Sequence, residues 1–208
     1  HLAELFGIKT VPHALIPLKS GELAYITKRI DRTKKNEKIQ MEDLCQLSER
    51  LTEDKYKGSM EQVTKVVKKY SSNPMFDALT LFEITLFSFL TGNADMHLKN
   101  FSLIFEHNLN MLSPAYDLLS TRLVIPKKND PEELALPING KKSNLKQKDF
   151  KIYSNNINMS EKQFNNVFEK FERIIPAALD FISRSFLSEN KKEELIELIK
   201  TRRLQIKL

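Results

Sequence analysis

The first thirty residues have the pattern of a hairpin that follows a short piece of helix. Residues 11–18 and 23–30 are rich in strand-forming side chains, and the polar link between them contains Gly21. This arrangement predicts two antiparallel strands. Residues 1–7 have the pattern of the last turns of a helix that Gly7 ends. Because no N-cap residue precedes them, we expect the chain to begin inside an element, with part of the domain upstream.

Beyond a polar loop at residues 33–38, apolar residues recur at helical spacing. Residues 74–90 are apolar on nearly every side, which predicts a helix in the centre of a core, ended by Gly92. Ser160 and Gln163 have the spacing of a capping box. The same periodicity predicts further helices over residues 40–51, 60–70, 160–171, 173–186 and 190–204.

Two segments lack helical periodicity. Residues 101–105 and 109–112 predict a second, short hairpin. Residues 123–144 contain three prolines and a glycine among charged residues, which predicts a loop with one short strand near residues 134–138. The chain therefore has a small β-containing beginning and a larger helical remainder.

Composition narrows the class of protein. With 208 residues, 41% of them apolar, the chain is long enough for one sizeable domain or two small lobes. The net charge of +6 is spread over several segments and is mild for a nucleic-acid binder. Cys45 has no second cysteine to pair with, so we expect a core residue in a reduced compartment. The longest apolar run is interrupted by Asp77 and Glu83, so we expect no membrane helix and a cytoplasmic protein.

A polar cluster follows the predicted core helix. Asp95, His97, Lys99 and Asn100 stand within six residues, and Asp117 follows beyond the short hairpin. Polar groups beside a buried element need hydrogen-bond partners or a ligand. This spacing is that of protein-kinase catalytic loops. In such loops an acidic residue is followed five positions later by Asn, with a basic residue between them, and a second acidic residue lies beyond a hairpin. There the first Asp orients the acceptor hydroxyl, and the Asn and the later Asp hold Mg²⁺.

Spacing alone leaves three alternative roles open for the cluster. Asn93, Asp95 and Asn100 are residue types that favour a capped turn after a helix. His97 and His107 could contribute to a zinc site, although no HExxH or CxxC spacing supports it. A Ser-His-Asp hydrolase is disfavoured because the sequence has no G-x-S-x-G motif.

Two motifs in combination resemble a known family. The stretch GNADMHLKNFS at residues 92–102, followed by PAYDLLS at residues 114–120, resembles the signature of HipA-type kinases, the toxins of bacterial toxin–antitoxin pairs. Shorter landmarks agree in order at residues 7–12, 25–32, 40–46 and 174–180. The resemblance runs over nearly the whole chain and implies a protein-kinase-like, two-lobed α+β fold. Residues 1–32 would complete the N-terminal lobe and the inter-lobe segment, and residues 33–208 would form the helical lobe.

The resemblance also implies roles for the residues of the cluster. Asp95 matches the catalytic aspartate of the family, and Asn100 and Asp117 match its magnesium ligands. His97 and Lys99 match basic loop residues near the phosphates or the substrate. For His97, a hydrogen bond that braces the loop is an equally good interpretation.

The nucleotide would be held elsewhere. Lys28, Arg29 and Ile30 match the segment between the lobes, whose backbone would meet the adenine of ATP, although Lys28 is also explained as a solvated strand end. The phosphate-cradling loop and the strand lysine of a kinase are not recognisable in this sequence. We therefore expect weak or absent phosphoryl transfer from these 208 residues alone.

The function that the resemblance implies is an ATP- and Mg²⁺-dependent Ser/Thr protein kinase of HipA type. It would be a toxin component that arrests growth by phosphorylating a cellular protein, held by an antitoxin partner and in contact with DNA only through that partner. A catalytically incomplete kinase-fold module that binds an antitoxin is the alternative from another class, and a kinase acting on small molecules would use the same loop.

Overall fold

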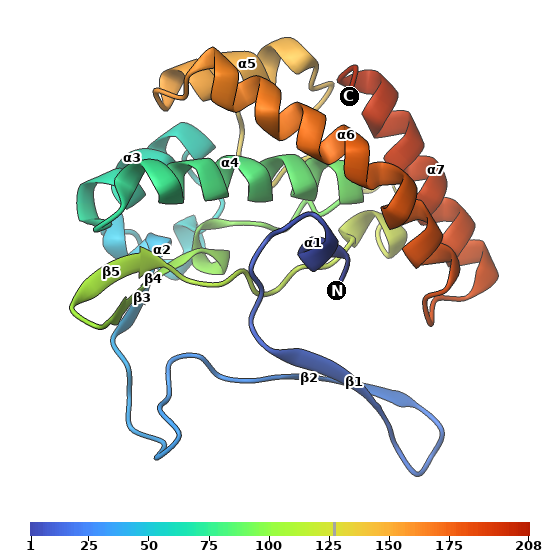
Figure 1. Ribbon diagram of the computed structural model, residues 1–208, viewed down its shortest axis with the longest axis horizontal. Helices are drawn as coiled ribbons and strands as arrows, with labels where there is room; N and C mark the ends of the chain where they lie inside the picture. Colours follow the sequence, from blue (N-terminus) through green and yellow to red (C-terminus); the bar gives the residue numbers. More distant parts are fainter. Residues whose placement is uncertain (127) are drawn as a thin grey trace.

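The long helix α4 (Pro74–Thr91) lies at the centre of the structure, with other helices packed around it (Figure 1). The computed structural model describes residues 1–126 and 128–208. Helices α3 and α7 pack directly on α4, and α1 and α7 contact α6. The helices around α4 are α1 (Leu2–Leu5), α3 (Met60–Tyr70), α5 (Gln147–Asn156), α6 (Glu161–Ser183) and α7 (Glu189–Gln205).

The two acidic residues of α4 are accommodated without leaving the core. Asp77 is buried and accepts hydrogen bonds from Ser71 Oγ at 2.6 Å and from the Leu112 amide at 2.9 Å. Glu83 forms an ion pair with Lys170 of α6 at 2.9 Å. Each carboxylate therefore has a partner, as buried charges require. The bond to Leu112 also fixes the short sheet against α4.

Helix α4 is long and apolar enough, by length and composition, to cross a membrane, with a mean hydropathy of 1.3 over its 18 residues. Length and composition alone do not place a helix in a membrane, so the expectation that α4 is not a membrane helix stays a prediction. Asp77 and Glu83 interrupt the apolar pattern without ending the helix, since each has hydrogen-bond or ion-pair partners. In the folded chain 67% of it is buried, and it is the core helix of the body.

Aromatic side chains fill the core beside α4. The ring of Phe82 lies 5.6 Å from that of Tyr153, 6.0 Å from that of Phe164 and 6.4 Å from that of Phe150. The Tyr153 hydroxyl is 2.9 Å from Thr64 Oγ1, so its polar end is satisfied inside the core. Burial raises the pKa of Tyr153 far above that of an exposed tyrosine.

Helix α7 reaches the C-terminal end of α4 through one buried guanidinium. Arg202 is only 4% exposed, donates a hydrogen bond to the Phe89 carbonyl, and lies over the Phe89 ring at 5.0 Å. Burial lowers its pKa to about 10. The carbonyl groups at the end of a helix lack intrahelical partners, and Arg202 supplies a donor there.

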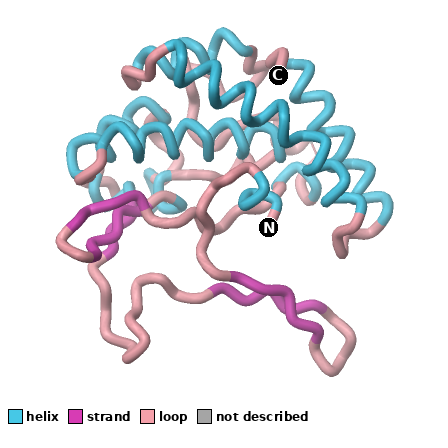
Figure 2. The backbone as a smooth tube through the Cα atoms, in the orientation of Figure 1, coloured by secondary structure: helices cyan, strands magenta, loops and turns pink. Residues whose placement is uncertain are grey.

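The strands form two separate sheets (Figure 2). One is antiparallel with the order β3 (Met41–Asp43), β4 (Ser102–Glu106), β5 (Leu109–Leu112), and it lies against the helical body. The other is the hairpin of β1 (His13–Pro17) and β2 (Leu23–Thr27), in register from His13 opposite Thr27 to Pro17 opposite Leu23.

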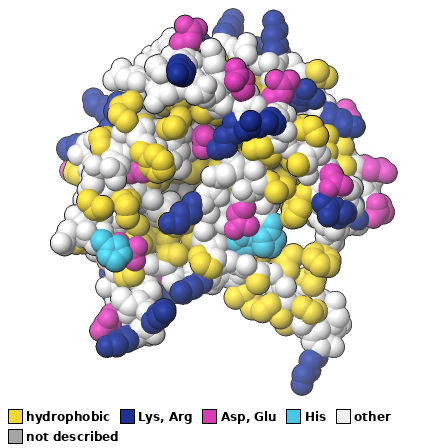
Figure 3. Space-filling model, in the orientation of Figure 1, with side chains coloured by type: hydrophobic (Ala, Val, Ile, Leu, Met, Phe, Trp, Pro, Cys, Tyr) yellow, Lys and Arg dark blue, Asp and Glu magenta, His cyan; other side chains and the backbone are white. Residues whose placement is uncertain are grey.

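The β1–β2 hairpin projects away from the body, and apolar side chains cover it (Figures 1 and 3). Six of its large apolar residues are between 41% and 61% exposed: Leu15, Ile16, Leu18, Leu23, Tyr25 and Ile26. Both faces of the hairpin carry them, because neighbours along a strand point to opposite faces. The small β-containing beginning and the larger helical remainder expected from the sequence are both present.

The prediction of one helix over residues 40–51 is wrong. Met41–Asp43 is strand β3, paired with β4, and only Leu44–Leu47 is helical, as α2. Asp43 caps that helix by accepting a hydrogen bond from the Gln46 amide at 2.9 Å, and Glu49 then takes a positive φ of 55°. Pairing with β4 outweighs the helical spacing of the apolar residues. Cys45 is buried with its thiol directed at the carbonyls of Arg50 and Leu51, in agreement with a core role.

The C-terminal helices also differ from expectation. The two helices expected over residues 160–186 are one, α6, which continues through Pro176 because its buried face runs unbroken from Phe171 to Ile182. The capping box of Ser160 and Gln163 is present. The sequence pattern does not predict α5, and in the described residues 134–138 no strand forms, although Leu134, Leu136 and Ile138 are buried. Helices α3, α4 and α7 and both hairpins are confirmed. Short 3-10 turns, η1 (Thr52–Asp54), η2 (Leu98–Asn100) and η3 (Thr121–Leu123), complete the chain.

Candidate active site

The loop between α4 and β4 begins at a glycine that no other residue could replace easily. Gly92 has a φ of 76°, and a Cβ there would lie 2.6 Å from Leu198 Cδ2 and 2.8 Å from Arg122 Cβ. Its carbonyl accepts hydrogen bonds from Thr121 Oγ1 at 3.0 Å and from the Arg122 amide at 3.1 Å. The start of the loop is therefore fixed to η3.

A capped turn then brings Asp95 and Asn100 together. The Asp95 amide donates to Asn93 Oδ1 at 3.1 Å, and the Asp95 carbonyl accepts from Asn100 Nδ2 at 2.9 Å and from the His97 amide at 2.8 Å. The capped turn that the sequence allowed as a structural role is thus present, and it orients the loop. Because the Asn100 amide nitrogen is engaged, its Oδ1 is the atom left to accept or coordinate.

Tyr56, between η1 and α3, contacts the Asp95 carboxylate. Its hydroxyl donates a hydrogen bond to Asp95 Oδ1, and its ring meets the His97 ring edge to face at 4.9 Å. Burial and the bond to Asp95 raise the pKa of Tyr56 to about 12, so it stays a donor at neutral pH. Within the described residues no hydrogen bond reaches the second oxygen of Asp95. Sequence reasoning missed Tyr56, because it stands in a polar stretch without a recognisable pattern.

His97 is buried in the loop, with 6% of its surface exposed. Burial and the nearby Lys55 lower the pKa of its imidazole, so the ring is neutral at pH 7. Its Nδ1 has no hydrogen-bond partner among the described residues. This environment favours a bracing or packing role over a positive charge near the phosphates. His107 lies on the β4–β5 turn and, in the part of the chain that the structure describes, forms no metal-binding group with His97.

Lys99 points to the neighbouring strand. Its ammonium forms an ion pair with Asp43 Oδ2 at 2.8 Å, and that bond raises its pKa. Its carbonyl accepts from the Tyr116 hydroxyl at 2.9 Å, which also lies 2.6 Å from Ser102 Oγ. Tyr116 thereby fastens the segment carrying Asp117 to the segment carrying Asn100.

Asp117 is exposed and adopts a positive φ of 56°. Burial, with added repulsion from Asp43 and Asp117, raises the pKa of Tyr116 to about 12. The Asp117 carboxylate also acts on Tyr56, so it lies within electrostatic reach of the loop. The exposed carboxylate of Asp117 and the amide Oδ1 of Asn100 are both hard oxygen donors of the kind that Mg²⁺ prefers, so the chemistry of the two residues fits such an ion.

The segment containing Lys28, Arg29 and Ile30 lies beside the loop. These residues line a depression together with Lys99 and Tyr116, among others. The Lys28 amide is engaged by the Pro12 carbonyl at 2.8 Å, whereas the Arg29 and Ile30 amides make no backbone hydrogen bond among the described residues. The Arg29 side chain is directed to Asp31, away from a ligand role.

A second, mainly apolar cavity lies on the other side of Tyr116. Val11, Leu15 and Tyr25 of the hairpin segment line it, together with Asp117 and Leu118. Burial and the Asp117 carboxylate raise the pKa of Tyr25. The two hollows share Val11 and Tyr116, so the hairpin and the loop face one another across a recessed surface.

Known proteins match both the sequence and the structure. The sequence model of the family described as the HipA-like C-terminal domain matches residues 1–179. The Sinorhizobium fredii protein "Putative kinase Y4dM" is 37% identical over 122 residues, which are 58% of this chain and 29% of that protein.

Two solved structures are similar to the fold. HipA of Shewanella oneidensis MR-1, in complex with HipB and operator DNA, has a TM-score of 0.78 at 20% identity, over 98% of this chain and 52% of that chain. The Helicobacter pylori proinflammatory kinase CtkA has a TM-score of 0.68 at 17% identity, over 99% of this chain and 80% of that chain. At these identities the likeness is one of fold. The mixed α+β, kinase-like class expected from the sequence is confirmed.

Proposed function

The chain belongs to the HipA-like C-terminal domain family, and from that premise we propose that it is the kinase core of a HipA-type Ser/Thr protein kinase. It would transfer the γ-phosphoryl group of ATP to a hydroxyl of a cellular protein. Residues 1–32 would belong to the N-terminal lobe and residues 33–208 to the helical lobe. The names of the kinase relative and of the kinase-fold neighbour support this class of reaction.

The observation that carries the proposal is the fixed relation between Asp95, Asn100 and Asp117. The Asn100 side chain is bonded to the Asp95 backbone, and Tyr116 ties the Asp117 segment to the Lys99 carbonyl. A loop that served only to cap a helix would have no need for a second segment, carrying the exposed Asp117 carboxylate, to be fastened to it.

Asp95 would orient the acceptor. Tyr56 holds one carboxylate oxygen, and the other is free of protein donors among the described residues. The acceptor hydroxyl would donate its hydrogen to this free oxygen, which aims its oxygen at the γ-phosphorus. The new O–P bond forms as the bond between the γ-phosphorus and the bridging oxygen of ADP breaks, and the hydroxyl proton passes to Asp95.

Mg²⁺ would be held by Asn100 Oδ1 and the Asp117 carboxylate. When bound, the ion neutralises negative charge on the phosphate oxygens. The backbone of Arg29 and Ile30 offers free amides to the adenine, in the hollow that also reaches Lys99. His97 would brace the loop through its contact with Tyr56, and Lys99 would remain a charged neighbour of the site, paired with Asp43.

The biological setting is part of the same proposal. We place the protein in the cytoplasm as the toxin of a toxin–antitoxin pair, with an antitoxin protein as its partner and DNA reached only through that partner. The HipA neighbour is found with HipB and operator DNA, which supports this assignment. The aligned part covers 29% of the kinase relative, so the test belongs in the longest form of the protein.

Substitutions at the proposed reacting groups, at a residue that contacts them and at a remote control position test the function. Asp95→Asn and Asp117→Asn should each lower phosphoryl transfer from ATP by about 10²–10⁴-fold and abolish growth arrest on expression. Tyr56→Phe, which keeps the ring against His97, should cost roughly tenfold in kcat with little change in KM for ATP. Asp180→Asn, on the exposed face of α6, is the matched control and should stay fully active. Full activity of both Asp95→Asn and Asp117→Asn would refute the assignment.

A non-catalytic module that binds an antitoxin is the second candidate, favoured by the apolar, exposed β1–β2 hairpin. The same variants separate the two functions through ligand-dependent stability. A kinase should show a rise in Tm that needs both ATP and Mg²⁺ and is lost in the Asp117→Asn variant, because binding to the native state alone stabilises it. A binding module should show no such rise.

A further inference from the structure

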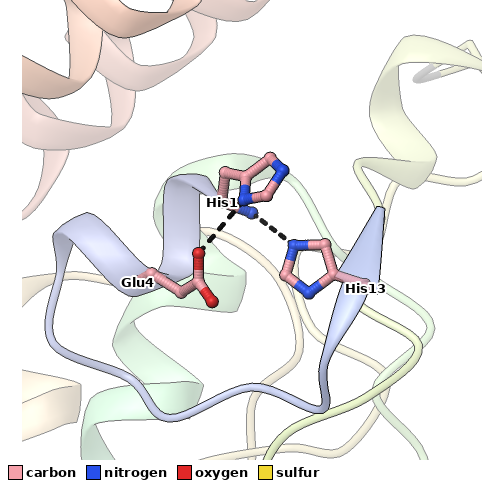
Figure 4. A group of neighbouring side chains, drawn as sticks. All are labelled: His1, Glu4 and His13. Atoms are coloured by element: carbon pink, nitrogen blue, oxygen red, sulfur yellow. Dashed lines mark hydrogen bonds and ion pairs between the residues drawn. The ribbon is translucent and has the colours of Figure 1, made fainter. Parts of the chain in front are cut away.

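Three potential metal ligands meet where α1 joins β1, outside the candidate active site. His1, Glu4 and His13 each offer one ligand atom, and these atoms all lie within 4.8 Å of one another (Figure 4). The rings of His1 and His13 have centroids 4.4 Å apart, and His1 Nδ1 lies 3.1 Å from Glu4 Oε2. Sequence reasoning missed the group, because the spacing of His1, Glu4 and His13 matches no common metal-binding motif.

Neighbouring groups already orient two of the three ligands. His13 Nδ1 lies 2.8 Å from the Val11 carbonyl, so its N–H points there and its Nε2 carries the lone pair. Thr10 Oγ1 donates to Glu4 Oε1 at 3.0 Å, which leaves Oε2 on the side of His1. Ligating histidines and carboxylates in metal sites are held by outer partners of this kind.

One contact lies where an ion would bind. His1 Nδ1 and Glu4 Oε2 are 3.1 Å apart, within hydrogen-bond distance of each other. This contact joins two of the atoms that a cation would bind instead. Because His1 and Glu4 are exposed, small side-chain rotations can bring the ligand atoms to the roughly 3.3 Å separations that zinc–ligand bonds of about 2.0–2.1 Å require.

We propose that His1, Glu4 and His13 form a zinc site with one open position. Two imidazoles and one carboxylate suit Zn²⁺, whereas Mg²⁺ and Ca²⁺ prefer oxygen donors alone. The ion joins α1, whose C-cap residue Phe6 packs against Phe171 of α6, to β1, which in the described part of the chain pairs with β2 alone. It therefore holds the hairpin in a fixed orientation to the body.

The site lies on the wall of the apolar cavity that also contains Asp117. His1 and His13 line that cavity with Tyr25 and Asp117. Zinc at this position orders the hairpin side of the recessed surface without touching Asp95 or Asn100. Its binding is independent of phosphoryl transfer and can be measured on a protein that has no kinase activity.

Zinc titration of the untagged, chelator-treated protein tests the site. Calorimetry should give saturable binding of one Zn²⁺ per chain, and Tm should rise by roughly 5–10 °C at a zinc concentration about 100 times the Kd. His13→Gln and Glu4→Gln should each remove both effects. His107→Gln, at another exposed histidine, should retain them, and Mg²⁺ at the same concentration should not replace zinc.

Two further outcomes decide the proposal. Hydrogen exchange in residues 13–27 should slow when zinc binds the parent chain, and should be unchanged in the His13→Gln variant. Far-UV circular dichroism without zinc should be the same for both, which excludes loss of folding as the cause. An absence of stoichiometric binding, or binding that survives both His13→Gln and Glu4→Gln, would overturn the site.

Discussion

Large apolar side chains are buried in the helical body and exposed in the β1–β2 hairpin. In the body, Phe82, Phe150 and Tyr153 are fully buried in contact with one another. In the hairpin, Tyr25 and Ile26 are 61% and 48% exposed. Both regions are rich in apolar residues, so composition alone does not separate them.

The difference teaches where the stability of the chain resides. Burial of a large apolar side chain contributes about 1.5–3 kcal/mol to the free energy of unfolding, and the helical body contains many such side chains. A two-stranded hairpin with both faces in solvent is marginal by itself. The candidate active site uses both regions, since Asp95 and Asn100 belong to the rigid body and Tyr25 faces Asp117 from the hairpin.

Truncation of one aromatic side chain in each region should give the largest difference in the free energy of unfolding. Phe82→Ala should lower the free energy of unfolding by about 3–5 kcal/mol, because it opens a cavity between three aromatic rings. Tyr25→Ala should lower it by less than about 1 kcal/mol, as its ring is mainly exposed. Urea denaturation of both variants measures the two values, and equal losses would remove the distinction between the regions.

Alanine at one glycine in each region gives a smaller contrast with the same chemistry. Gly92 and Gly21 both have positive φ, at 76° and 88°. Gly92→Ala adds overlap with Leu198 and Arg122 and should cost about 2–4 kcal/mol, whereas Gly21→Ala meets no atom within 4 Å and should cost about 1 kcal/mol from backbone strain. Thermal unfolding compares them, and a larger loss at Gly21 would contradict the packing argument.

A dependence of stability on pH is the smallest of the expected effects. Burial holds the folded pKa of His97 below its unfolded value of about 6.5, so below that pH the unfolded chain binds a proton that the folded chain refuses. The free energy of unfolding should fall as the pH drops through about 6.5 and stop falling below the folded pKa. Removing this contribution with His97→Gln should lessen the loss, seen as a smaller fall in Tm between about pH 7 and about pH 5 than in the parent protein. His107→Gln, at the exposed turn, is the control and should leave the profile unchanged.

Helices could be predicted from sequence where the local pattern and the packing in the folded chain favour the same structure. Residues 60–70 and 74–91 are helical because apolar periodicity, capping and burial all favour it, and Gly92 ends the second at its positive φ. The local pattern misassigns residues 40–51 because strand pairing of Met41 with Ile104 is a long-range interaction that leaves no local signal. It also divides α6 in two, because the continuous packing that joins the halves across Pro176 is likewise a property of the folded chain.

The candidate site was predictable in part. Asp95, Asn100 and Asp117 follow a spacing that the chemistry of a kinase loop requires, and the structure brings their segments together. Tyr56 and Asp43 contact Asp95 and Lys99 from distant positions, 39 and 56 residues away. Partners at such separations are chosen by the fold, so no local motif contains them.

The guanidinium of Arg202 has a consequence for how the protein is made. Arg202 is 113 residues beyond Phe89, the residue whose carbonyl it caps at the end of α4. A ribosome synthesises the loop that carries Asp95 well before α7 emerges, and until then the base of that loop lacks both the buried donor and the packing of Leu198 against Gly92. The growing chain therefore carries the polar residues of the site for several seconds before it has the scaffold that orients them.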